Sequence, residues 1–142
     1  MTTLQPSLLL RRALFADGLV GVATAAQLLL LADWLSNLLA LPRELLIGAA
    51  LVLLPLAAFL LWLSRRESLT AATVYSVLGL NALWILHSGL LLLSGWVAPN
   101  LLGYGFVIGQ ALVVLVFIEL EWIGLKRSQA VPGAFTQASV GA

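Results

Sequence analysis

Five polar side chains stand inside stretches of this sequence that are otherwise almost entirely apolar. Two are carboxylates, Asp17 and Glu119, and the others are Asn81, His87 and Gln110. A polar or ionisable group in an apolar segment is costly to keep. Such residues therefore either bind a proton, an ion or a ligand, or hydrogen-bond a neighbouring helix.

The first carboxylate lies on a face of small residues. Asp17, Gly21 and Thr24 recur at intervals of four and three, so a helix places them on one side. Gly21 and Ala25 form a small-xxx-small step that lets a second helix approach closely. Two interpretations of Asp17 stay open: a proton or cation site, or an ion pair near the membrane surface with a basic residue such as Arg11.

The histidine belongs to a polar stripe. Asn81, Trp84, His87 and Ser88 share one helical face, which must contact protein because unpaired polar groups in hydrocarbon cost several kcal/mol each. The stripe either hydrogen-bonds another helix or makes His87 a titrating or ligand-binding group. His87 is the only histidine in the sequence, which argues against a metal site.

The last apolar stretch contains a GxxxG step, Gly105 and Gly109, which is a second close-packing surface. Glu119 falls near this glycine face and at about the depth of Asp17. If the two carboxyl groups face each other, they resist double ionisation and would share a proton or recruit an arginine, which would make a proton relay or a cation site. The alternative is an ion network near the inner membrane surface with Arg11, Arg12 or Lys126. Glu121 lies nearer the membrane edge, where we expect it to reach the headgroups.

The elements that position these groups are predicted by the length of the apolar stretches. A membrane-spanning helix needs about 20 residues, because each rises about 1.5 Å across a core of about 30 Å. Four stretches qualify, at about 13–31, 45–63, 69–93 and 101–125. Short connections predict an all-α bundle of four antiparallel helices running up-down-up-down.

The remaining segments are short. The connection 32–44 is apolar enough to form a short amphipathic helix at the interface. We expect residues 1–127 to form a single transmembrane domain. The end of the sequence, 128–142, is small and polar without periodicity, and we expect a mobile cytoplasmic tail.

Positive charges predict the orientation. In a protein with four spans, the segment before the first span, the connection between the second and third, and the segment after the fourth lie on one side of the membrane. These segments contain six of the seven Lys and Arg residues: Arg11, Arg12, Arg65, Arg66, Lys126 and Arg127. The other side has only Arg43, offset by Asp33 and Glu44. The positive-inside rule therefore predicts that both termini are cytoplasmic. Interfacial aromatic residues would be Trp34, Trp96 and Tyr104 outside, with Trp62 and Trp122 inside.

Composition narrows the function classes. The 142 residues are 62% hydrophobic and 9% charged, which is typical of a membrane protein. A net charge of +1 with no basic patch argues against nucleic-acid binding. The sequence has no cysteine, no nucleophile–base constellation, no histidine pair and no phosphate-binding glycine loop. We therefore expect no enzymatic activity, no metal and no cofactor.

Three motifs carry a resemblance. "NALW" (81–84), "SGWVAPNLLG" (94–103) and "FVIGQA" (106–111) are similar to segments of uncharacterised small four-span bacterial membrane proteins. The resemblance covers chiefly the second half of the chain. It implies a multi-pass protein of the bacterial inner membrane and implies no activity.

Two functional hypotheses follow. In the first, the protein acts through helix association with a membrane-protein partner or with copies of itself, as an accessory subunit or homo-oligomer. Its packing points would be Gly21, Ala25, Gly105 and Gly109. In the alternative, it is a small transporter or channel in which Asp17 and Glu119 handle protons or cations. Its pocket would be lined by Asn81, Trp84, His87 and Gln110. Convergence of these side chains on one cavity would favour the alternative.

Overall fold

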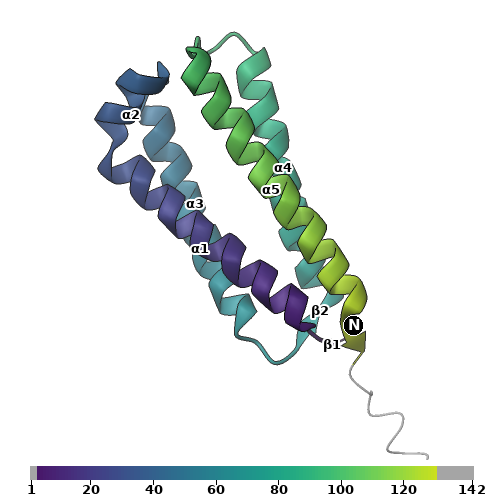
Figure 1. The fold of residues 1–142 in the computed structure, drawn as a ribbon. Helices are drawn as coiled ribbons and strands as arrows, with labels where there is room; N and C mark the ends of the chain where they lie inside the picture. The colour runs from purple at the N-terminus through teal and green to yellow at the C-terminus, as the bar shows by residue number, and fades with distance from the viewer. Residues whose placement is uncertain (1–2, 131–142) are drawn as a thin grey trace, which may run out of the picture.

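The computed structural model describes residues 3–130 and consists of five helices and one small sheet (Figure 1). The helices are α1 (Leu8–Leu30), α2 (Ala32–Leu39), α3 (Arg43–Ser64), α4 (Ala71–Leu93) and α5 (Leu101–Arg127). The strands are β1 (Thr3–Gln5), β2 (Leu69–Thr70) and β3 (Gln129–Ala130). Four helices, all except α2, are long and apolar enough to cross a membrane. The prediction of an all-α protein with four such helices is confirmed.

Side-chain caps set where three of the long helices begin. The cap residues are Ser7, Thr70 and Asn100, and each accepts a hydrogen bond of 2.9 to 3.2 Å from the backbone N–H three residues later. Each bond satisfies a donor that the first helical turn leaves without a partner. Because Ser7 caps α1, this helix begins before the predicted start at residue 13.

The long helices form two antiparallel pairs. α1 packs along α3, and α4 packs along α5, while α1 and α5 join the pairs. Within the described residues, α3 and α4 have no extended contact. The two pairs lie close together at the end that carries β1 and diverge toward the end that carries α2 (Figure 1).

The apolar core is divided into two clusters, one toward each end of the bundle. The cluster near α2 contains Ala25, Leu28, Leu35, Leu39, Leu41, Leu46, Ala50, Val97 and Val107. The cluster near the sheet contains Leu10, Leu14, Leu60, Leu63, Leu69, Val74, Val77 and Leu125. Asp17 and Asn81, two of the polar residues predicted from the sequence, are buried between residues of the two clusters along α1 and α4.

A three-stranded antiparallel sheet ties one end of the bundle together. β1 is the central strand and pairs with β2 on one side and β3 on the other. The segment before α1, the connection before α4 and the end of α5 therefore lie at the same end. β3 belongs to the predicted tail, of which residues 131–142 lie outside the described part.

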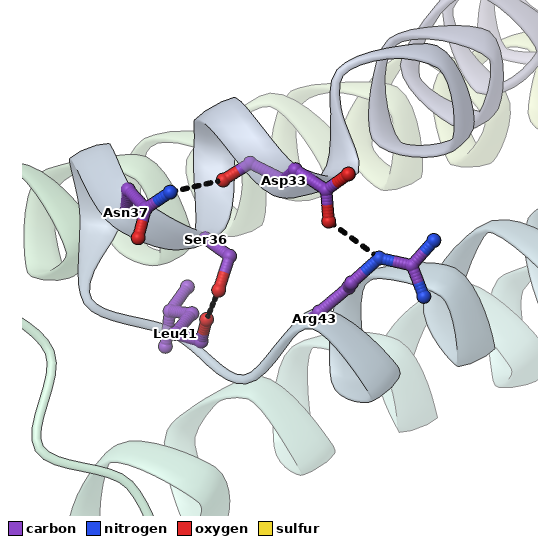
Figure 2. Close-up of polar contacts among 5 residues, drawn as sticks. All are labelled: Asp33, Ser36, Asn37, Leu41 and Arg43. Carbon is purple, nitrogen blue, oxygen red and sulfur yellow. Dashed lines mark hydrogen bonds and ion pairs between the residues drawn. The ribbon is translucent and has the colours of Figure 1, made fainter.

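At the opposite end, α2 is a short amphipathic helix, as predicted for the connection 32–44. It buries Ala32, Leu35 and Leu39, and a left-handed residue, Ala40, ends it. The Asp33 carboxylate pairs with Arg43 at 2.6 Å, and Ser36 donates a hydrogen bond to the carbonyl of Leu41 (Figure 2). The charge of Arg43 is thus offset by Asp33, as the sequence indicated.

The two ends differ in charge. Near the sheet, Arg66 lies over the ring of Trp62 and Lys126 over the ring of Trp122, each 4.9 Å from the ring centroid. Stacking of this kind holds basic side chains beside aromatic rings of the type found at membrane surfaces. At the α2 end, Trp34, Trp96 and Tyr104 are exposed.

Candidate functional site

A buried polar centre joins three helices. Asp17 of α1, Asn81 of α4 and Glu121 of α5 are 7%, 3% and 0% exposed. The Asn81 amide donates to Asp17 Oδ2 at 2.9 Å and to Glu121 Oε2 at 3.3 Å. One nitrogen atom thus contacts an oxygen of each carboxyl group, which holds the two acids close together. The other oxygen of Glu121, Oε1, is buried without a hydrogen-bond partner.

The acidic partner of Asp17 is Glu121, whereas the sequence suggested Glu119. Glu119 is exposed, and Glu121, which we expected among the headgroups, is completely enclosed. Residues two apart on a helix point about 200° away from each other, so only one of the two can face α1. The pairing inferred from the glycine face was therefore wrong.

Close approach of α5 to α1 encloses Glu121. A Cβ atom added to Gly124 would lie 2.7 Å from both the backbone nitrogen and the Cα atom of Leu10. Only glycine permits this contact, which covers the face of α5 that also carries Glu121. The signal in the sequence was the spacing of Glu121, Gly124 and Leu125, all of which are buried.

No basic side chain neutralises the centre. Within residues 3–130, the single ion pair joins Arg43 to Asp33 at the far end of the bundle. Of the two interpretations of Asp17, the ion pair with a nearby arginine is thus not formed. An asparagine takes that position, and its amide group supplies hydrogen bonds but no compensating charge.

A second polar network lies one layer nearer α2. Trp84 Nε1 donates to Gln110 Oε1 at 2.6 Å, and Gln110 Nε2 donates to Ser88 Oγ at 3.0 Å. Ser88 in turn donates to the carbonyl of Trp84. This network joins α4 to α5. His87 does not enter it, because His87 is exposed and its Nδ1 contacts the Leu83 carbonyl of its own helix.

Two adjoining cavities occupy the space between the helix pairs. The larger, of about 420 Å³, lies mainly between α3 and α4 and includes Glu44, His87 and Ser88 in its wall. The smaller, of about 150 Å³, includes Asp17 and Asn81. Thr24, Trp84 and Gln110 line both cavities. Asp17, Asn81, Trp84, His87 and Gln110, but not Glu119, thus line one continuous region.

The predicted packing residues divide into two groups. A Cβ atom added to Gly21 would lie 3.0 Å from Ala57 Cβ, and Ala25 is completely buried, so this step packs α1 against α3. By contrast, Cβ atoms added to Gly105 and Gly109 would meet no atom within 4 Å. The GxxxG step is therefore not used for packing within residues 3–130.

The donor set at the polar centre limits its chemistry. Among the described residues, no group of three or more His, Cys, Asp or Glu side chains could hold a metal ion. Two carboxyl groups held close together can share one proton, because each disfavours ionisation of the other. In comparisons with known proteins, no protein family, no curated protein and no solved structure matches this chain.

Proposed function

We propose that this protein is a small membrane carrier that couples the movement of a small molecule to proton binding at Asp17 and Glu121. One observation carries the proposal. Two carboxyl groups from different helices are buried together beside a cavity, and they have a hydrogen-bonding asparagine but no basic partner.

The reasoning starts from the cost of buried charge. Two carboxylates at close range in a medium of low dielectric constant resist double ionisation. A proton bound by the pair of Asp17 and Glu121 removes one charge and supplies a donor in addition to the Asn81 amide, at a site where Glu121 Oε1 has no hydrogen-bond partner. A monovalent cation at the same place would do the same. Loading and unloading such a site is the elementary step of coupled transport.

The cavities favour a carrier over a purely structural protein. A volume of about 420 Å³ falls in the range typical of small-molecule sites. Polar side chains scattered through the sequence converge on this cavity and its smaller neighbour. Since Asp17 lines the smaller cavity and Asn81 links it to the enclosed Glu121, a bound molecule and a bound proton would lie close enough to influence each other.

We further propose that the sheet end faces the cytoplasm of a bacterial inner membrane. Six basic residues lie at or near this end, and Trp62 and Trp122 hold two of them at the level expected of headgroups. The opposite end has a single arginine, which is paired with Asp33. No enzymatic step is proposed.

The test is infrared spectroscopy of carboxyl protonation in the purified protein. We expect the wild type to show a carboxylic acid absorption at neutral pH that disappears in Asp17→Asn and in Glu121→Gln. Glu119→Gln is the matched control, because Glu119 is exposed on the same helix and should leave the absorption unchanged. An absorption that persists in both Asp17→Asn and Glu121→Gln would contradict the proposal.

A second candidate function is association with another copy of this chain through α5. The observation that favours it is the unused packing surface at Gly105 and Gly109. In a cysteine-free chain, Leu112→Cys should allow disulfide cross-linking of neighbouring copies in the membrane. Gly109→Leu should abolish the cross-link, whereas Gly79→Leu, on α4 and equally open, should not. Equal cross-linking in both variants would exclude this surface.

A further inference from the structure

The cavities indicate what kind of molecule is carried, an inference that rests on the proposed function. We propose that the ligand is a mainly apolar organic cation. It would enter the larger cavity from the bilayer between α3 and α4 and exchange with a proton held by Asp17 and Glu121.

The apolar part of the ligand is inferred from the cavity wall. Most of the side chains that line the larger cavity are hydrocarbon: Leu28, Leu41, Leu45, Leu46, Val52 and Leu91 among them. A wall of this kind stabilises a ligand by removing apolar surface from water and offers few hydrogen bonds to a polar one.

The positive charge is inferred from the ionisable groups of the two cavities. The acidic side chains are Glu44 in the larger cavity and Asp17 in the smaller. Of the side chains that line the two cavities, only His87 can become positively charged. No Lys or Arg lines either cavity among the described residues. Glu121, which is buried and has one carboxyl oxygen without a hydrogen-bond partner, is a further acidic group close to the cavities. The interior therefore favours a cation and disfavours an anion.

The route from the bilayer is inferred from the side of the bundle. α3 and α4 lack extended contact in the described part, so the two walls of the larger cavity are separate helices. On the α3 wall, Gly48 has no atom within 4 Å of an added Cβ, and Val52 is 58% exposed. A ligand dissolved in the hydrocarbon can therefore reach the cavity without crossing a headgroup layer.

Exchange follows from electroneutrality. The titratable groups of the polar layer are Asp17 from α1 and Glu121 from α5, while α4 contributes Asn81 and α3 contributes only apolar side chains. When the cationic group arrives beside the carboxyl pair, the shared proton leaves. One positive charge thus replaces another, and the charge of the buried site is conserved.

The test measures binding and proton release with tetraphenylphosphonium as the probe, on the full chain in lipid nanodiscs. Tetraphenylborate, of the same shape and opposite charge, is the control ligand. We expect the phosphonium to bind and to release close to one proton per molecule into a weakly buffered solution. Because the proton competes, affinity should rise about tenfold per pH unit while the pair titrates.

Variants locate the site. Asp17→Asn and Glu121→Gln should abolish proton release, whereas Glu119→Gln, at an exposed position that lines neither cavity, should retain it. Gly48→Leu should weaken phosphonium binding at least about tenfold by filling the cavity. A Cβ atom at this position meets no atom within 4 Å, and the rest of the leucine side chain would extend into the cavity, so the protein should still fold.

The outcomes separate the two proposals. Equal binding of tetraphenylborate would overturn the assignment of a cationic ligand. Phosphonium binding that is unchanged in Gly48→Leu would overturn the assignment of the larger cavity as its site. Absence of phosphonium binding in a protein that still shows the infrared absorption of the carboxyl pair would overturn the ligand alone. Absence of both would overturn the carrier function as well.

Discussion

Asn81 is the residue on which the polar centre depends. Its single amide group has two N–H donors, and each is directed to a carboxyl group on a different helix. Among uncharged side chains only those of asparagine and glutamine offer two donors from one nitrogen, and asparagine is the shorter. This explains why an asparagine, which is costly in a membrane-spanning helix, stands near the middle of α4.

Replacing Asn81 with leucine should destabilise the protein. Asn81→Leu keeps the volume but leaves two buried carboxyl groups without donors, which costs about 1–3 kcal/mol of unfolding free energy. Unfolding in mixed micelles measures the change. Asn37→Leu is the control, since Asn37 is exposed and bonds only the carbonyl of Asp33 in its own helix. Equal stability of Asn81→Leu and wild type would show that the donors contribute nothing.

Asp17→Asn should separate stability from function. Removing a buried carboxylate that has no basic partner should leave the unfolding free energy unchanged or higher by about 1 kcal/mol. Proton release and transport should be lost. A protein that acts only through helix association would instead lose stability or assembly, so the same unfolding and transport measurements discriminate the two hypotheses.

The sequence identified Asp17 and Asn81 because each is isolated in an apolar stretch. It misplaced Glu121 because depth was counted from a predicted helix end at residue 125, while α5 continues to Arg127. Enclosure of Glu121 depends on how closely another helix approaches. That distance is set by Gly124 against Leu10, a contact between residues far apart in the chain.

At the scale of elements, glycines decide which helices meet. Gly124→Ala should force α5 away from α1 and reduce stability by about 1–3 kcal/mol, because its Cβ would meet the backbone of Leu10. The matched substitution Gly105→Ala meets no atom within 4 Å and should stabilise the helix by about 0.5–1 kcal/mol. Thermal unfolding of both variants tests the pair. Equal effects would mean that the α1–α5 contact is looser than described.

The positions of the helices could be predicted from the sequence. Which helices pack against each other could be predicted only in part. Hydrophobic length and the caps at Ser7, Thr70 and Asn100 set the helices within a few residues of their predicted ends. The short connection between α3 and α4 suggested that these two helices pack together along their length. They do not, and β2, which lies in that connection, pairs with β1. Strands of two or three residues have too few positions to show alternation in a sequence.

At the scale of the whole molecule, orientation is the property to measure. Because the chain has no cysteine, single cysteines can be introduced and labelled with an impermeant maleimide in intact cells. Asn37→Cys and Ser94→Cys, at the α2 end, should react from outside. Ser68→Cys, near the sheet, should react only after the membrane is permeabilised. The reverse pattern would contradict the positive-inside prediction.

The division of the polar centre among α1, α4 and α5 has a consequence for biosynthesis. α1 emerges from the ribosome long before α4 and α5, so Asp17 enters the bilayer when neither Asn81 nor Glu121 has been made. A lone aspartate at the middle of a span costs about 2.5–3.5 kcal/mol on insertion. The highly apolar α3, which packs along α1, is the helix then available to carry it into the membrane. The first half of the chain is thus inserted with a carboxyl group whose hydrogen-bonding partners arrive only with the last two helices.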